Sequence, residues 1–172
     1  MPTPSKARAV VKTAIIAATY AALTFSLAPL SFGEVQVRVA NALIGLVPLV
    51  GMPGVVGISL GVLIGNLASP LGPLDLLSAV PTFASLLILL RLKRVSVLAG
   101  LACYTAILSA WVGFLLNHLL GLPFVIVFAY LIVGIGIATV GLGYLLYASL
   151  KMVLRDSGGG RADRKAEHEG KK

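Results

Sequence analysis

The stretch FVIVFAYLIVGIGIATVGLGYLLYASL, residues 124–150, contains no charged side chain. A helix that crosses a membrane needs about 20 consecutive, mainly apolar residues, so this run is long enough to form one. Other apolar runs precede it along most of the chain. Of the 172 residues, 58% are hydrophobic and 12% are charged, whereas soluble domains carry about 25% charged residues. The sequence therefore predicts an all-α, integral membrane protein.

Proline, glycine and polar residues divide the apolar part into six predicted transmembrane helices. Their expected bounds are residues 10–30, 36–50, 54–69, 74–92, 96–120 and 123–154. The second and third helices are short and separated only by the sequence GMP, so a re-entrant hairpin is the alternative for this pair. We expect one transmembrane substrate-binding domain at 1–155 and a disordered, charged cytoplasmic tail at 156–172, because Gly-rich, charged sequence buries too little apolar surface to fold.

Lysine and arginine gather before the first predicted helix, between the fourth and fifth, and after the sixth. The residues are Lys6, Arg8, Lys12, Arg91, Lys93, Arg94, Lys151 and Arg155. With six crossings, these three places fall on one side of the membrane, and basic flanks favour the cytoplasmic side. We therefore expect a multi-pass protein of the cell membrane with both termini in the cytoplasm. Arg38 is then expected on the outer side, against the rule.

The outer half of the predicted bundle holds nearly all of the polar side chains. They are Glu34, Gln36, Arg38, Asn41, Asn66, Asp75, Asn117 and His118. Ionisable groups at membrane depth are costly and usually face a protein interior or a water-filled cavity, where they bind something. The sequence therefore predicts a polar pocket that opens outward.

Structural roles are the alternatives for these residues. Glu34 and Arg38 are four residues apart and suit a helix-start ion pair, which is worth about 0.3–0.5 kcal/mol when exposed. Asp75 follows a Gly-Pro turn and suits an N-terminal cap. Asn66 suits an interhelical hydrogen bond. Trp111 suits an interfacial anchor, or an aromatic face that stacks on a flat ring.

Several function classes lack their sequence signature. There is no G-x-x-x-x-G-K-[ST] phosphate loop, no H-E-x-x-H and no G-x-S-x-G, so we expect neither an enzyme nor a resident cofactor or metal in this chain. Asp75 alone makes a poor proton relay, and the two halves show no inverted repeat of broken helices. Basic residues beside a span favour topology or anionic lipid over nucleic acid. Energy for transport is therefore expected from a partner.

The first predicted helix carries Ala14, Ala18 and Ala22 at intervals of four residues. Small residues at this spacing let another helix approach closely. The spacing alone leaves two interpretations open, which are docking of a partner chain and packing within the protein's own bundle.

Three stretches resemble the QueT family: AATYAALTF at 17–25, PLSFGEVQVRVANAL at 29–43 and GNLASPLGPLDLL at 65–77. The Q-x-R element and the N-x-x-S-x-L-G-x-x-D element together make the resemblance fairly specific. QueT proteins are the membrane substrate-binding components (S components) of energy-coupling factor (ECF) transporters and are assigned to the uptake of queuosine precursors. The last two helices match the family only in hydropathy.

The resemblance implies six helices, a binding pocket near the outer surface, and a docking role for Ala14, Ala18 and Ala22. The docking partner would be a transmembrane coupling subunit that works with two ATPase subunits, which use the ATP. The implied substrate-binding residues are Gln36, Arg38, Asn66 and Asp75, with Asn41 beside them and Trp111 or Tyr104 stacked on a 7-deazaguanine-type base. Asn41 stands where the family pattern has Glu, so we expect a neutral base or related heterocycle as readily as a cationic one.

The sequence alone is also compatible with three alternatives to a queuosine-precursor transporter. The same architecture would serve an S component for a different vitamin-like solute. A non-transport membrane scaffold would tolerate any polar replacement at Arg38 and Asp75. An intramembrane enzyme is the third, although its motifs are missing.

Overall fold

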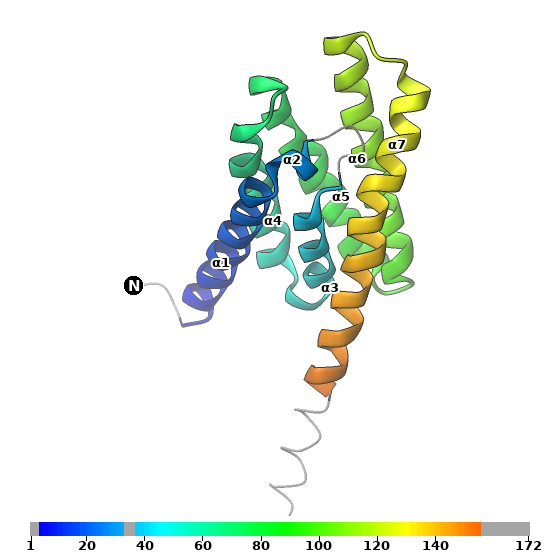
Figure 1. The fold of residues 1–172 in the computed structure, drawn as a ribbon. Coiled ribbons are helices and arrows are strands. Elements are labelled where there is room, and N and C mark those ends of the chain that lie inside the picture. Colours follow the sequence, from blue (N-terminus) through cyan, green and yellow to red (C-terminus); the bar gives the residue numbers. More distant parts are fainter. Residues whose placement is uncertain (1–3, 33–36, 156–172) are drawn as a thin grey trace, which may run out of the picture.

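The computed structural model describes residues 4–32 and 37–155, and this part of the chain is helical without a strand (Figure 1). All six predicted segments are helices. Four of them are long and apolar enough to cross a membrane, namely Ser5–Ser26, Gly72–Leu92, Val97–Leu120 and Phe124–Arg155. Two are shorter apolar helices, Val39–Val50 and Met52–Ala68. The prediction of an all-α membrane protein is confirmed, whereas the predicted tail at 156–172 lies outside the described residues.

Most of the six segments are built from more than one helical piece. In chain order the pieces are α1 (Pro4–Ser26), α2 (Ala28–Ser31), η1 (Val39–Leu46), α3 (Val47–Val50), α4 (Met52–Gly65), η2 (Asn66–Ala68), η3 (Gly72–Ser78), α5 (Ala79–Leu92), α6 (Val97–Leu120), α7 (Phe124–Gly136) and η4 (Ile137–Leu142). The labels η1, η2 and η3 denote 3₁₀ helices, and η4 is a π-helical stretch from which the last helix continues to Arg155.

Proline and glycine explain where the helical pieces break. Pro29 lies in the first turn of α2, where its missing N–H costs nothing, and the long α1 has ended three residues earlier at Ser26. Pro48 has the same place in α3. Gly51 turns the chain from α3 into α4 with a φ of 80°, a left-handed conformation that favours glycine.

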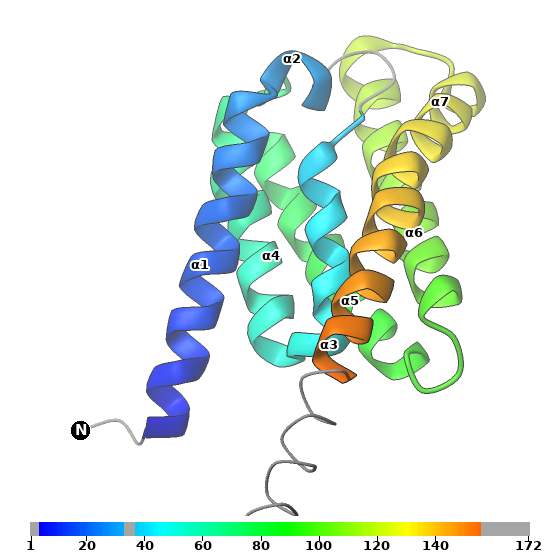
Figure 2. The ribbon, with the colours of Figure 1, turned by 60° about the horizontal axis from the view of Figure 1, so that its bottom comes forward.

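The six segments form a closed ring around one core. Going round it, α1 packs on α4, α4 on α5, α5 on α6, α6 on α7, η4 on η1, and η1 back on α1. The chain passes back and forth along the bundle, so the start of α1 and the end of the last helix lie at the same end (Figures 1 and 2). Buried apolar side chains from all six segments fill the ring.

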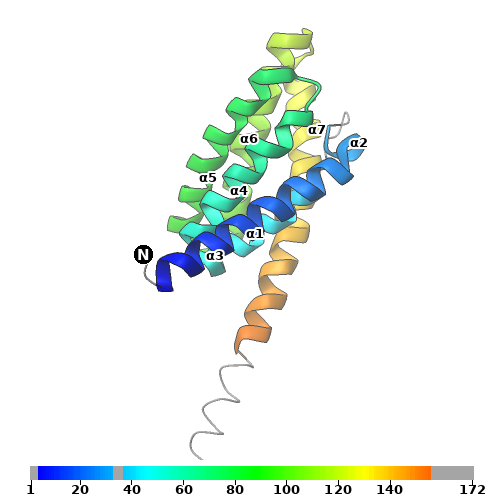
Figure 3. The same cartoon turned by 90° about the vertical axis from the view of Figure 1, so that its left-hand side faces the viewer.

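A stripe of three glycines, Gly57, Gly61 and Gly65, brings α4 against α1, which lies alongside it in Figure 3. A Cβ atom at Gly61 would lie 2.6 Å from Cβ of Tyr20, and one at Gly65 would lie 3.0 Å from Cγ2 of Thr24. The two backbones can approach closely because these positions carry no side chain. This contact fixes the position of α1, and with it Tyr20, inside the bundle.

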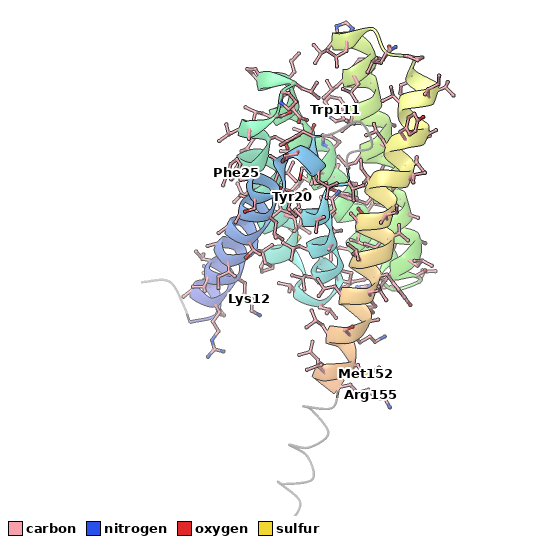
Figure 4. The ribbon with its side chains drawn as sticks, in the orientation of Figure 1. Lys12, Tyr20, Phe25, Trp111, Met152 and Arg155 are labelled. Atoms are coloured by element: carbon pink, nitrogen blue, oxygen red, sulfur yellow. The ribbon has the colours of Figure 1, made fainter. Side chains whose placement is uncertain are left out.

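The three basic flanks lie at one end of the bundle. Lys12 and Arg155 mark this end in Figure 4. Lys93, in the connection between α5 and α6, donates from Nζ to the carbonyl oxygen of Pro48 at 3.0 Å, which ties that connection to α3. The distribution of charge along the sequence therefore corresponds to one basic end in space.

Candidate functional site

Two hydrogen-bonded groups of polar side chains lie buried inside the helical ring. The first links α1 to η1: the hydroxyl of Tyr20 donates to Oδ1 of Asn41 at 2.6 Å. Tyr20 has no exposed surface, and Asn41 is also buried. The hydroxyl reaches this depth because the Tyr20 ring leaves α1 over Gly61. One helix contact thus positions one polar end of the site.

Arg38 is buried beside this pair, directly before the start of η1. Its guanidinium carbon lies 5.2 Å from the centre of the Phe32 ring, and its charge acts on the Tyr20 hydroxyl. A guanidinium over an aromatic face gains from the cation–π interaction when both are shielded from water. The exposed fraction of Arg38 is 8%, so the charge is held inside the protein and is not turned towards lipid.

Asp75 anchors the second group. Its Oδ1 accepts a hydrogen bond from the Ser78 hydroxyl at 2.7 Å, and Nε1 of Trp111 donates to the oxygen of Ser78 at 2.9 Å. Asp75 and Ser78 lie in η3 and Trp111 lies in α6, so the chain of bonds joins two segments. Asp75 is the fourth residue of η3, and its side chain accepts from the side chain of Ser78. It is therefore not the N-terminal cap that the sequence offered as an alternative.

Asn66 joins this group from the end of α4. Its Nδ2 donates to the main-chain carbonyl of Asp75 at 2.8 Å. Its Oδ1 is buried and has no hydrogen-bond partner among the described residues. A buried polar atom without a partner is costly, by about 1–3 kcal/mol. Asn66 therefore makes the expected interhelical bond and also keeps one acceptor for another group.

Arg38 and Asp75 are the only buried charged side chains among residues 4–32 and 37–155, and both act electrostatically on the Tyr20 hydroxyl. Their charges are opposite, so together they leave no net charge inside the bundle. Such a site offers a charged donor and a charged acceptor within one apolar bundle.

We call the two groups together the cluster; its members are Tyr20, Arg38, Asn41, Asn66, Asp75, Ser78 and Trp111. Sequence reasoning missed Tyr20 and Ser78, and it also missed the buried Thr82. Thr82 is fully buried, and its Oγ1 has no hydrogen-bond partner in the described part of the chain. Tyrosine, serine and threonine are common in helices, so their types give little signal. The signal for Tyr20 was indirect, since the glycines at intervals of four in α4 indicate a close partner helix.

The remaining predicted site residues have mixed outcomes. Arg38, Asn41, Asn66 and Asp75 are all buried; Asn66 bonds to Asp75, and Asn41 bonds to Tyr20. Gln36 and Glu34 lie outside the described residues. Trp111 is partly buried and reaches the cluster through its N–H, with its ring tilted against Phe114 at 6.2 Å. Asn117 and His118 are exposed; Asn117 donates to the carbonyl of Leu122, and His118 stacks on Phe114.

An apolar pocket of about 430 Å³ lies next to Phe32, and none of the cluster residues lines it. The ring of Phe32, which is in contact with the Arg38 guanidinium, forms part of the pocket wall. The other lining residues come from the turn before η3 and from the ends of α6 and α7 that meet at the connection 121–123: Pro70, Leu71, Leu116, Leu120, Leu122, Pro123, Ile126, Val127 and Tyr130. The cluster thus has an apolar neighbour at the end of the bundle opposite the basic flanks.

The alanine stripe occupies the other face of α1. Ala14, Ala18 and Ala22 are exposed, whereas Ala17 and Ala21 are buried. The protein's own bundle therefore leaves the stripe uncovered.

In the described part of the chain, no group of three or more His, Cys, Asp or Glu side chains forms a metal site.

An apolar helical bundle that encloses opposite charges and amides defines a multi-pass membrane protein with a candidate small-molecule site. The family model described as QueT transporter matches residues 10–152, and the chain belongs to this family. Its function is therefore membrane transport of a small molecule. Neither the curated proteins nor the solved structures contain a match to the chain.

Proposed function

We propose that this protein is the substrate-binding S component of an ECF-type importer and captures a queuosine precursor, a 7-deazaguanine-type base. The observation that carries the proposal is the burial of two opposite charges, Arg38 and Asp75, inside one ring of helices. In this proposal the basic end faces the cytoplasm, so both termini are inside and the cluster lies towards the outer leaflet.

The polar edge of such a base suits the groups that the cluster leaves unpaired. A 7-deazaguanine ring presents an N–H and an exocyclic amino group side by side, next to a carbonyl oxygen. Asp75 uses Oδ1 for Ser78, which leaves Oδ2 as its second acceptor. This oxygen and Oδ1 of Asn66 would accept the two donors, while Arg38 would donate to the carbonyl.

The charge of the site bears on the form of the substrate. Arg38 and Asp75 together contribute no net charge, and Asn41 adds none. Oδ1 of Asn41 accepts from Tyr20, so we expect Asn41 to act on the substrate as a donor through its amide N–H groups. A neutral base keeps this balance, whereas a cationic aminomethyl form would bring an unpaired positive charge. We therefore favour the neutral form.

The exposed alanine stripe of α1 is the proposed docking surface for the transmembrane coupling subunit. Two ATPase subunits would supply the energy, in keeping with the lack of a phosphate loop in this sequence. Tyr20 lies on the buried face of the same helix, so partner and substrate would contact opposite sides of α1.

Thermal-shift screening of the purified chain tests the substrate class. The screen compares 7-deazaguanine-type bases, neutral and cationic, with guanine and a set of vitamins. A selective shift with the neutral deazapurine supports the proposal. A shift only with a vitamin would identify an S component for another solute, and no shift with any compound would count against substrate capture by this chain. Mass spectrometry of small molecules that copurify with the chain gives an independent identification.

A further inference from the structure

The last helix extends well beyond the other segments at the basic end of the bundle (Figures 1 and 3). It is described from Phe124 to Arg155, 32 residues. At 1.5 Å per residue it is about 48 Å long, compared with a hydrocarbon layer of about 30 Å. If Phe124 lies at one boundary of that layer, the other boundary falls about 20 residues later, near Tyr144. The turns that follow then lie among the lipid headgroups.

One face of these turns combines aromatic and basic side chains. We call it the C-terminal stripe: Tyr144, Tyr147, Ala148, Lys151, Met152 and Arg155, which line a groove of about 370 Å³. The Lys151 ammonium lies 5.7 Å from the centre of the Tyr147 ring, and the rings of Tyr144 and Tyr147 are 6.1 Å apart. Tyrosine is enriched at the boundary between headgroups and acyl chains, and Lys and Arg reach from there into the headgroup layer.

The basic side chains of the stripe lack an acidic partner in the described part of the chain. Asp75 is the only acidic residue within 4–32 and 37–155, and it belongs to the cluster. The remaining sequence, 156–172, contains five Lys and Arg against four Asp and Glu, so it leaves the basic end positive. Exposed apolar side chains flank the stripe at Leu145, Val153 and Leu154. An occupant of this face must therefore suit both positive charge and apolar surface.

We propose that the C-terminal stripe is a binding site for an anionic phospholipid of the leaflet at the basic end. Lys151 and Arg155, one turn apart, hold the phosphate, the ring of Tyr147 lies at the glycerol level, and the acyl chains run along the flanking apolar side chains. A zwitterionic lipid gains less because its own ammonium group opposes the two basic side chains. This site is separate from the substrate cluster and does not depend on the identity of the substrate.

The test uses the full chain in nanodiscs that contain equal parts of phosphatidylglycerol and phosphatidylcholine. The lipids retained after detergent extraction are measured by mass spectrometry. The variant K151Q/R155Q removes both charges of the stripe. The matched control R91Q/R94Q removes two exposed charges at the same end, outside the stripe. Each basic residue near an anionic surface changes binding about fivefold, so the stripe variant should lose about 30-fold in its preference for phosphatidylglycerol.

Wild type and the R91Q/R94Q control should both retain phosphatidylglycerol selectively, and K151Q/R155Q should not. Equal retention by all three proteins would overturn the proposal. Equal loss in both variants would also overturn it, because the effect would then come from the general field of the basic end. If K151Q/R155Q keeps the lipid preference but no longer copurifies with other subunits, the stripe binds a protein partner and the proposal is overturned. Y147L, which keeps both charges, should weaken the preference and covers the case in which K151Q/R155Q fails to fold.

Discussion

Replacing Tyr20 with Phe removes one hydroxyl and keeps the ring that packs over Gly61. The hydroxyl donates to Oδ1 of Asn41 at 2.6 Å in a fully buried position, so its loss leaves that acceptor without its partner. An unpaired buried acceptor costs about 1–3 kcal/mol, whereas interhelical hydrogen bonds in membrane proteins average about 0.6 kcal/mol. We expect the free energy of unfolding to fall by about 1–2 kcal/mol.

The assay is reversible unfolding of the purified chain in mixed micelles, followed by circular dichroism. A double-mutant cycle with Asn41→Ala isolates the bond, because the double variant should lose little more than either single variant, with a coupling of about 1 kcal/mol. Tyr130→Phe is the control, since Tyr130 is exposed and should show no change. Additive losses for Tyr20 and Asn41, or an equal loss in the Tyr130 control, would refute the reasoning.

Three further predictions concern the helix contact, the docking face and the aromatic link. Gly61→Ala should destabilise the protein by about 1–3 kcal/mol because the new methyl group overlaps α1, while Gly141→Ala, with no atom within 4 Å of its Cβ, should not; mixed-micelle unfolding of both variants decides. Ala18→Trp should prevent copurification of the proposed coupling subunit and leave substrate binding unchanged; normal copurification would contradict the proposed docking surface. Trp111→Phe removes the N–H that holds Ser78 and should weaken substrate binding about fivefold in a titration, whereas unchanged affinity would separate Trp111 from the site.

The positions of the helical segments could be predicted from the sequence because membrane insertion depends on long apolar runs, which the sequence shows directly. Each of the six predicted segments is a helix, and the largest shift is at the first, which begins near Pro4 and breaks at Leu27. The 3₁₀ form of η1 and the π-helical turn at η4 were not predicted. These two pieces pack on each other, and a Cβ at Gly45 in η1 would collide with the carbonyl of Gly143, directly after η4. Tertiary packing of this kind leaves no periodic pattern in either segment.

The candidate site was predictable only where a residue was conspicuous in its surroundings. A lone charge in an apolar run, such as Arg38 or Asp75, stands out by its cost at membrane depth. Ser78 and Thr82 do not stand out, because short hydroxyl side chains are tolerated on any face of a membrane helix. Trp111 was predicted as an anchor or stacking ring, and its bond to Ser78 depends on the distance between η3 and α6, which no spacing in the sequence gives.

A binding titration of the purified chain with a neutral 7-deazaguanine-type base tests the central claim most directly. Wild type should bind, and Asp75→Ala should bind at least about 30-fold more weakly, because truncating a buried charge that pairs with the ligand costs about 2–5 kcal/mol. Asn117→Ala, an exposed polar residue at the end of α6, should bind like wild type. Equal affinity of wild type and Asp75→Ala would contradict the assignment of the buried cluster as the substrate site.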